Sequence, residues 1–450
     1  MTTMELQEEL TQLYKNNAES IAKDTSEIIN KSREKAFEDF KKLGIPNKKN
    51  EDYKYTDLMS YLKGDYSYEI APARIKVDVE ELFKCDIPEL NTHIILAVNG
   101  FYYELNNPGK LPEGMIIDSF AQASLKYPEI VNKHYSKYAD TSKDSLAALN
   151  TLFAQDGIFI YIPKNTTLDK PIQIVNIGYS RQNLRVTRRN LIVAEPGSNV
   201  SFLICDHTLC MQSFITNALT EIYVGENAVV DYVKMQNENS NSTHIANNFI
   251  HQEANSNFIS NTISLHGGLI RNNTFVKLNG EGAHNDSLGM FYCDDHQHVG
   301  TFTYVQHAKP NCTSNQLFKG ILDEQATGAF NGRILVDKYA MKTQAYQRNN
   351  NILLSKTARM NTKPQLEIYN DDVKCSHGAT IGQMDNDALF YLRSRGISYK
   401  EARHLLMYAF ANEVIGQIKV EPLRERMIEL VDRRLRGELS RCQNCNLYRS

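Results

Sequence analysis

The spacing of apolar residues predicts helices at both ends of the chain. In residues 1–43, leucine, isoleucine and phenylalanine recur at helical spacing, and Gly44 and Pro46 end the pattern. Helical spacing returns after residue 384, where we expect three more helices. The first of these covers residues 385–393 and ends near Gly396. A helical region therefore flanks each side of the middle of the chain.

The last two predicted helices have recognisable starts. Ser398 and Glu401 match a capping box, in which each side chain binds the backbone amide of the other residue. Pro422 fits the first turn of the final helix. One face of that helix mixes acidic residues with arginines, so we expect a solvated, salt-bridged surface or else a docking face for a partner protein. The arginines are Arg424, Arg426, Arg433, Arg434 and Arg436.

Between about residues 157 and 369 the helical spacing disappears. Short segments of alternating apolar residues are broken by Gly, Asn, Asp and Pro, often near every ten residues, which predicts an all-β region. Sandwich, barrel and β-solenoid all fit, but the many asparagines near turns favour an irregular β-helix. Upstream, Asn99 and Gly100 predict a hairpin, and residues 144–153 predict a short helix. We divide the chain into a mixed helical region (1–150), a β core (151–383) and a C-terminal helical domain (384–450).

Composition narrows the class of protein. The chain of 450 residues has 23% charged residues and a net charge of −3, which gives no general reason to expect nucleic acid or an anionic membrane as a partner. The N-terminus lacks the pattern of a secretory signal, and no apolar run is long enough to span a bilayer. The eight cysteines are scattered, so we expect reduced thiols in a cytoplasmic protein. The usual motifs for nucleotide hydrolysis, zinc proteases and serine hydrolases are absent.

The most reactive pair of side chains lies where the β region meets the C-terminal helices. Cys375 and His377 are two residues apart, so they share one face if residues 373–377 are extended. A thiolate beside an imidazole suits iron, copper or zinc, and also a Cys–His nucleophilic pair. A packed cysteine beside a hydrogen-bonded histidine is the simpler alternative. Two ligands are too few for a closed site, so a metal there needs a second chain or an open position.

Other cysteine and histidine segments are weaker candidates, because polar strand residues near turns are common and a single C-x-x-C pair has low specificity. They are Cys293 with His296 and His298 on a second strand, Cys205 with His207 on a third, and Cys442 with Cys445 near the C-terminus.

Seven motifs stand out along the chain: residues 50–56, 310–314, 319–323, 328–332, 361–369, 371–380 and 388–396. Together they resemble the SufD family of the SUF iron–sulfur cluster assembly system. The resemblance is dense from about residue 270 to 415 and favours SufD over its paralogue SufB, whose C-terminal cysteine and glutamate and N-terminal cysteine motif are not found here. At residue 53, tyrosine stands where the family commonly has tryptophan.

The resemblance implies a mainly β protein, with a right-handed parallel β-helix core between N-terminal and C-terminal helical regions. It implies a non-catalytic subunit of a scaffold with SufB and the ATPase SufC, and SufC is expected to dock on the C-terminal helices. Candidate docking residues are Leu405, Phe410 and Arg424. The isolated chain is expected to hold no tightly bound cofactor and to be able to form a homodimer.

SufB is expected to pair with the last β-helix strands. The family's interface histidine falls on His377, with Cys375 beside it, so iron or a nascent cluster is expected there in the complex. Pro364, Glu367 and Tyr369 are further interface candidates. The family also leads us to expect a second histidine after His298, which this chain lacks, so we assign His298 no metal role.

Two other functions remain open at this point. One is a β-helix polysaccharide lyase or hydrolase that uses carboxylates such as Asp294, Asp295, Asp371 and Asp372. The other is a structural adaptor in which Cys375 and His377 only pack.

Overall fold

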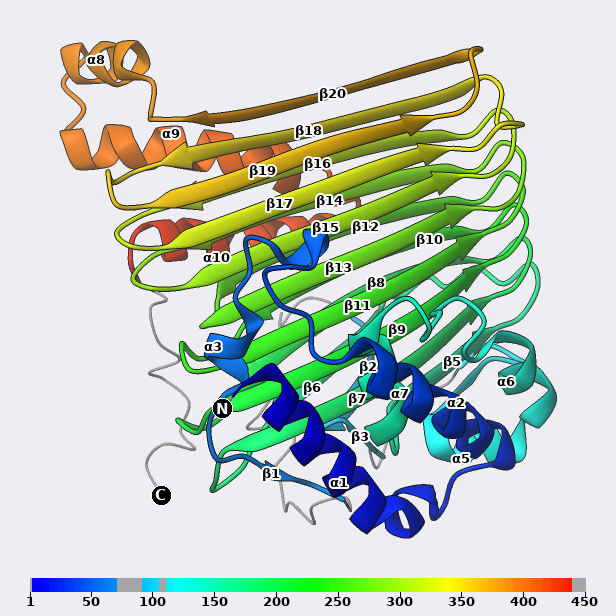
Figure 1. The fold of residues 1–450 in the computed structure, drawn as a ribbon. Helices are drawn as coiled ribbons and strands as arrows, with labels where there is room; N and C mark the ends of the chain where they lie inside the picture. Colours follow the sequence, from blue (N-terminus) through cyan, green and yellow to red (C-terminus); the bar gives the residue numbers. More distant parts are fainter. Residues whose placement is uncertain (1, 71–90, 105–110, 439–450) are drawn as a thin grey trace.

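The computed structural model describes residues 2–70, 91–104 and 111–438. Two ten-stranded sheets run side by side through the molecule, and from β5 onward consecutive strands alternate between them (Figure 1). Neighbouring strands within each sheet are parallel along this core, and each coil of the chain adds one strand to each sheet. The core is therefore a parallel β-helix with helices at both ends of the chain, which confirms the predicted fold class.

We call the two sheets A and B. In sheet order, sheet A contains β4 (Ile116–Ser119), β5 (Ile158–Ile162), β7 (Leu184–Ala194), β9 (Phe214–Val224), β11 (Thr243–Gln252), β13 (Leu269–Leu278), β15 (His298–His307), β17 (Thr327–Val336) and β19 (Arg359–Ile368), with β1 (Ser67–Tyr68) beside β7. Sheet B contains β3 (Phe101–Tyr103), β2 (His93–Val98), β6 (Ile172–Gly178), β8 (Asn199–Thr208), β10 (Val229–Asn237), β12 (Asn257–His266), β14 (His284–Cys293), β16 (Thr313–Leu322), β18 (Thr343–Leu353) and β20 (Val373–Gly382).

Stacked turns set the length of each coil. At one corner of the helix, Asn227, Asn255 and Asn311 have φ angles of 57°, 53° and 60°. Asparagine and glycine adopt this left-handed conformation more readily than other residues. The Asn227 amide donates to the carbonyl of Ala254 (2.9 Å), which joins one turn to the next. The residue after each asparagine is small and buried, so the corners stack closely.

Successive side chains of each strand point to opposite faces, and those on the inner face form the interior of the β-helix. Because register partners in parallel strands share a face, one inward position repeats through the sheet; Phe202, Tyr232 and Ser260 form such a column in β8, β10 and β12. The lower coils are filled by apolar side chains, including Val200, Phe202 and Phe258. Toward the last coils, amides such as Gln316 and Gln347 occupy inward positions.

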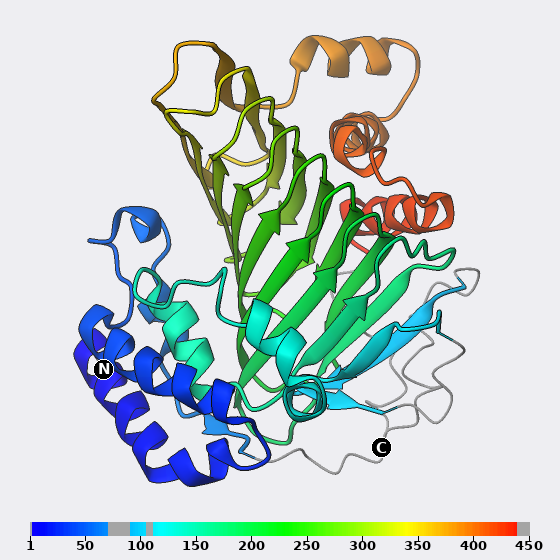
Figure 2. The same cartoon turned by 90° about the vertical axis from the view of Figure 1, so that its right-hand side faces the viewer.

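Helices cover part of the outer face of each sheet (Figure 2). On sheet A lie the N-terminal helices and α7, whereas α9 and α10 pack on sheet B. The helices are α1 (Thr3–Ala22), α2 (Glu27–Leu43), the 3-10 turn η1 (Glu51–Tyr53), α3 (Leu58–Leu62), α5 (Phe120–Lys126), α6 (Pro128–His134), α7 (Ser145–Phe153), α8 (Asn386–Ser394), α9 (Tyr399–Ile415) and α10 (Glu421–Leu435). Among the residues described, none of these helices combines the length and apolar character needed to cross a membrane.

The predicted local elements are largely confirmed. Residues 3–43 are helical apart from a break around Asp24. Asn99 and Gly100 turn the β2–β3 hairpin with φ angles of 50° and 87°. The Asp144 carboxylate caps α7 by accepting from two backbone amides. The divisions at residues 150 and 383 remain predictions, although β2, β3 and β4 already belong to the two sheets.

Two expectations about the C-terminal helices are wrong. Arg434 is not solvated: it is 1% exposed, and its guanidinium binds the Asp294 carboxylate at 2.9 and 2.7 Å because this side of α10 packs on sheet B. The capping box is only half formed. Ser398 accepts from the Glu401 amide (3.2 Å), but the Glu401 carboxylate pairs with Arg436 instead of turning back.

Candidate functional site

The last coil of the β-helix is uncovered. β19 ends sheet A and β20 ends sheet B, and no strand in the described part of the chain pairs with their outer edges (Figure 1). An edge strand presents unpaired backbone amides and carbonyls, which makes it a template for a strand of another chain. The open end of the β-helix therefore presents a surface to which a strand of another chain can add.

β20 is extended over the predicted Cys–His segment. In register, Cys375 pairs with Ala345 of β18 and His377 pairs with Gln347. Ala345 and Gln347 are buried and face the interior of the coil below. Because parallel register partners share a face, Cys375 and His377 both continue that interior at its open end.

The two side chains differ in exposure. Cys375 is half-buried beside an apolar cluster that includes Ile334 and Val336. Burial raises the pKa of the Cys375 thiol, and a backbone hydrogen bond from Ala345 opposes this only in part. The thiol is therefore protonated at neutral pH in the isolated chain. His377 is exposed. In the described residues no three His, Cys, Asp or Glu side chains come together as a metal site.

β19 contributes the opposite wall of the open end. Pro364 pairs in register with Gly332 of β17, which places it on the inward face one coil above Gly332. Glu367 points to the outer face, where its carboxylate lies 3.3 Å from Arg333 Nε. Tyr369 follows the strand and is 65% exposed. Of the predicted residues, the structure thus brings Cys375, His377 and Pro364 to one open end and places Glu367 outside it.

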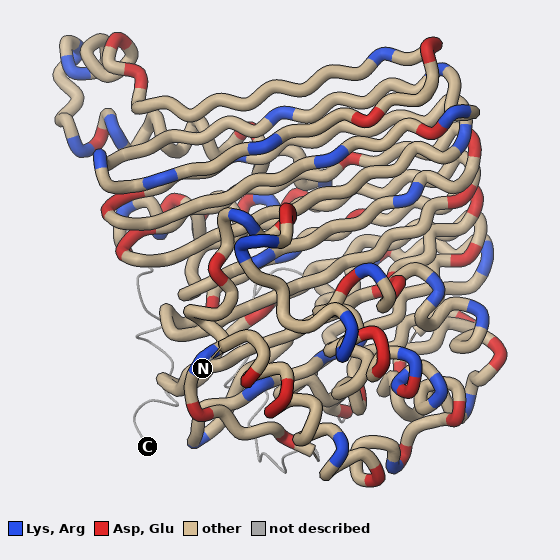
Figure 3. The backbone as a smooth tube through the Cα atoms, viewed as in Figure 1, with Lys and Arg blue, Asp and Glu red and all other residues tan. Residues whose placement is uncertain are grey.

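Apolar surface is concentrated near this end. Ten of the fifteen exposed large apolar side chains in the described residues lie between Tyr339 and Leu405, and they include Ile368 and Ile381 on the two edge strands. Lys374 is the only Lys, Arg, Asp or Glu in β20 (Figure 3). Proteins usually protect free edges with charge or proline, and β20 has little of either. This edge is suited to being covered.

The C-terminal helices divide into a packed part and a projecting part. Phe410 of α9 faces sheet B, where Lys319 Nζ lies 4.1 Å from its ring centroid. Leu405 is 38% exposed, and Arg424 pairs with Glu421 at 3.3 Å. α8 has no buried residue and stands away from the sheets in Figures 1 and 2. Its Phe390 is 75% exposed, a feature that sequence reasoning missed although adjacent aromatics on a short helix signal it.

The residues of the weaker candidate site around residue 298 do not lie on one strand. Cys293 ends β14, His296 lies in the turn, and His298 begins β15, so they cannot share a strand's faces. His298 is buried, with Nε2 3.0 Å from Thr56 Oγ1 and Nδ1 2.7 Å from Thr327 Oγ1. Burial lowers the pKa of His298 to about 4. It is a structural histidine that holds the N-terminal segment on sheet A.

This pKa predicts acid sensitivity. The unfolded chain binds a proton at His298 below about pH 6.5 and the folded chain does not, so stability falls as pH drops, by about 1.4 kcal/mol per pH unit between pH 6.5 and 4. His298→Gln should lower the slope of the unfolding free energy against pH by about 1.4 kcal/mol per pH unit, which is the effect of one proton. The slope is measured by urea titrations at several pH values. His296→Gln, at a side chain 71% exposed, should leave the slope unchanged. An equal slope in the His298 variant would contradict this assignment.

Within the described part of the chain, the candidate pair Cys205 and His207 belongs to no cluster of three potential metal ligands. Cys205 and His207 lie on one strand, β8, as predicted, and Cys205 packs in the apolar layer between sheet B and the C-terminal helices. Between them, Asp206 faces the interior and binds Arg188 (3.0 Å) and Lys234 (3.4 Å). Cys442 and Cys445 lie outside the described residues.

The carboxylates proposed for polysaccharide cleavage are far apart. Asp294 and Asp295 follow the end of β14, whereas Asp371 and Asp372 precede the start of β20. Both strands belong to sheet B and run in parallel, so the pairs lie at opposite sheet margins, roughly 30 Å apart for ten residues at about 3.3 Å each. Asp294 is also occupied by Arg434. The enzyme alternative is not favoured.

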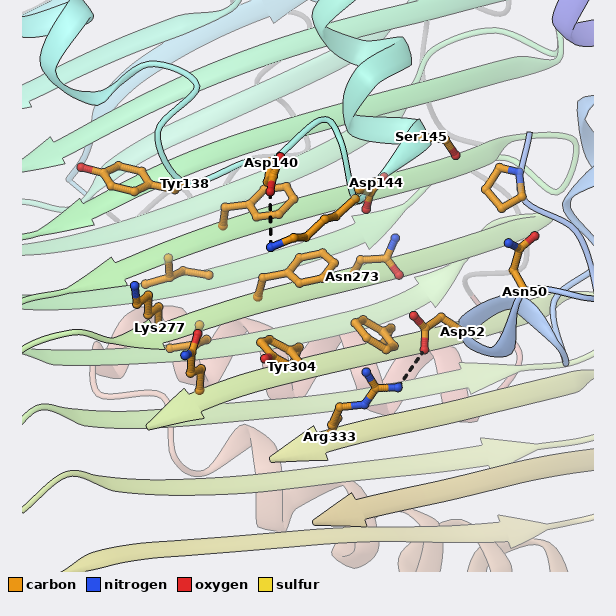
Figure 4. A pocket seen from close by; sticks show the side chains of 18 of the residues that line it. Asn50, Asp52, Tyr138, Asp140, Asp144, Ser145, Asn273, Lys277, Tyr304 and Arg333 are labelled. Atoms are coloured by element: carbon orange, nitrogen blue, oxygen red, sulfur yellow. Dashed lines mark ion pairs between the residues drawn. The ribbon is translucent and has the colours of Figure 1, made fainter. Parts of the chain in front are cut away.

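A pocket of about 1000 Å³ opens on the outer face of sheet A. It lies between the segment around residues 50–53, the loop before α7 and the sheet (Figure 4). Two ion pairs join residues of its lining: Asp140 with Lys143 (3.4 Å) and Asp52 with Arg333 (3.6 Å). Lys137 and Lys277 also line the pocket.

The same region anchors the N-terminal motif 50–56. Arg271 is buried in sheet A, donates to the Asp52 carbonyl (2.8 Å), and stacks 4.7 Å from the Tyr53 ring centroid. Glu51 forms an ion pair with Lys363 on β19. The motif thus crosses the outer face of sheet A as far as the edge strand, which supports β19 from the side opposite Pro364.

Comparison with known proteins identifies the family. Residues 4–174 match a model described as the SufBD protein N-terminal region. Residues 177–410, more than half of the chain, match the model of the SUF system FeS cluster assembly SufBD core domain.

Relatives agree over nearly the whole length. An iron–sulfur cluster assembly SufBD family protein of Synechocystis is 32% identical over 437 residues, which cover 95% of each chain. The iron–sulfur cluster assembly protein SufD of Escherichia coli is 31% identical over 422 residues, covering 88% of this chain and 90% of the relative. SufD of Bacillus subtilis is 27% identical over 328 residues, covering 72% and 75%. The chain therefore belongs to the SufBD family of iron–sulfur cluster assembly proteins.

Proposed function

We propose that this chain is a non-catalytic SufD-type subunit of the SUF scaffold and pairs with a SufB-type chain through β19 and β20. The observation that carries this proposal is the uncovered last coil, with free strand edges and an inward face that continues the core. Strand addition at such an edge satisfies the free backbone groups and buries the exposed Ile368 and Ile381. A second copy of this chain can use the same edge, which supports a homodimer in the absence of the partner.

The cargo of the interface is iron or a nascent iron–sulfur cluster. Cys375 and His377 supply one soft and one borderline ligand, and the partner chain supplies the rest. Metal binding displaces the proton from the Cys375 thiol, whose pKa is raised by burial, so metal affinity at this site should fall as pH falls.

The C-terminal helices are the docking surface for the ATPase SufC. α9 and α10 are fixed on sheet B, while α8 presents Phe390 and Tyr391 with Leu405 nearby in the chain. Aromatic side chains held by a short helix fit the anchors of a protein interface. Arg424 lies on α10 and Phe410 supports α9 from its inner side. ATP hydrolysis belongs to the SufC partner.

The test is anaerobic reconstitution of the complex co-purified with SufB and SufC. His377→Ala is compared with wild type and with Ser376→Ala, an exposed neighbour on the opposite face of β20. We expect all three complexes to assemble and only His377→Ala to lose visible cluster absorption, with Cys375→Ser intermediate. Equal absorption in His377→Ala and wild type would rule out the ligand role and leave a purely architectural subunit.

A further inference from the structure

A column of polar side chains leads through the core to His377. Gln316 of β16, Gln347 of β18 and His377 of β20 are successive register partners. Adjacent strands lie about 4.8 Å apart, and register partners share a face, so each side chain lies directly above the one before. Gln316 and Gln347 are 2% and 1% exposed.

Hydrogen bonds fix the direction of this column. Thr303 of β15 donates its hydroxyl to Gln316 Oε1 (2.7 Å), and Gln347 Nε2 donates to the same oxygen (3.1 Å). The nitrogen of the Gln347 amide is therefore engaged with the coil below. Its oxygen, Oε1, is buried and has no hydrogen-bond partner.

Space for this amide is provided by Gly332. A methyl group at residue 332 would lie within 2.7 Å of both Nε2 and Cδ of Gln347, so a larger residue there would displace the amide from its present position. Pro364, the register partner of Gly332, lies one coil above on the same wall. The core is thus shaped to hold the Gln347 amide at the level just below His377.

An unpartnered buried carbonyl oxygen lowers the stability of the folded chain by about 1–3 kcal/mol. A hydrogen-bond donor that reaches this oxygen in the assembled complex removes that cost. Histidines that bind metals usually donate their second ring N–H to a neighbouring acceptor, which fixes the tautomer and the ring orientation. A neutral amide oxygen is suitable because it accepts a hydrogen bond without adding charge.

We propose that Gln347 Oε1 accepts a hydrogen bond from the His377 imidazole when a partner chain covers the last coil. Gln347 is then a positioning residue: it selects the tautomer of His377 and directs the other ring nitrogen to the interface. The identity of the metal cargo rests on the proposed function, whereas the hydrogen bond does not require a metal.

The hydrogen bond is tested in the metal-free complex. This chain is labelled with 15N-histidine, and the His377 signal is assigned by its loss in His377→Ala and followed by solid-state NMR of the sedimented complex. We expect one tautomer in wild type and a changed or mixed tautomer in Gln347→Leu. The matched control is Gln344→Leu, at a glutamine on the exposed face of the same strand, which should match wild type. Gln347→Met provides the same test if the leucine variant does not fold.

A second measurement uses ferrous iron. Loss of an orienting partner should weaken iron binding to the complex by about 10- to 100-fold in anaerobic chelator competition, and Gln344→Leu should not. An unchanged tautomer in Gln347→Leu overturns the inference, whatever His377→Ala does to cluster formation. A changed tautomer together with full cluster formation in His377→Ala supports the hydrogen bond and overturns only the proposed ligand role.

Discussion

Ala379→Lys should abolish pairing with a SufB-type partner and leave the isolated chain as stable as wild type. Ala379 is exposed in the isolated chain and pairs in register with Asn349, whose side chain is buried in the coil below. A partner strand that covers the last coil therefore buries this position. An unpaired ammonium there costs about 3–5 kcal/mol, which corresponds to a loss in affinity of at least about 100-fold. Binding is measured with the purified partner, and stability by urea unfolding.

The adjacent residue provides the control. Thr380 points to the opposite, outer face of β20, so Thr380→Lys should change affinity by less than about tenfold, since rim charges contribute little to affinity. Wild-type affinity in Ala379→Lys would contradict pairing through the open end. Equal losses in both variants would indicate damage to the strand itself.

Glu221→Ala should remove about 5 kcal/mol of folding stability. Glu221 and Arg189 are fully buried, and their side chains meet at 2.5 Å. The carboxylate also accepts from the backbone amides of Ser136, Tyr138 and Ala139, at 2.9 to 3.1 Å. Truncation leaves a buried guanidinium and three backbone amides without their acceptor, and each loss is costly.

Urea unfolding measures this loss, with exposed Glu226 as the matched position. Glu226→Ala should stay within about 0.5 kcal/mol of wild type, as for most surface substitutions. Glu221→Gln should fall between the two, because its amide oxygen can serve some of the donors but not balance the charge. A loss below about 1 kcal/mol in Glu221→Ala would show that Arg189 and the 136–139 loop find other partners.

The extent of the β core was predictable because strand alternation and turn residues are local signals. The coil length was not, because it varies: register partners are 26 residues apart at Thr243 and Leu269 but 32 apart at Thr327 and Arg359. A strict repeat search fails on such a chain. The stronger signal is the pairing of Asn or Gly with a small residue at one corner of several successive coils, as in Asn227 and Ala228.

The candidate site was predictable in part for the same reason. Two residues on one strand, Cys375 and His377, follow from the period of a strand. Gln347 is 30 positions earlier and becomes a neighbour of His377 only through parallel register. Arg434 was misassigned because an arginine near the end of a helix predicts a solvated side chain, whereas its acceptor Asp294 is distant in sequence. The sequence pattern does not show which residues far apart in the chain become neighbours in the fold.

Hydrogen–deuterium exchange of β20 tests the central claim most directly. The backbone amides of Val373–Gly382 are followed by mass spectrometry in the isolated chain at low concentration and in the complex with the SufB-type partner. Because the edge is free in the isolated chain and paired in the complex, we expect strong protection of β20 on assembly and little change in the buried strand β12. Full assembly with unchanged exchange in β20 would contradict partner binding through the last coil.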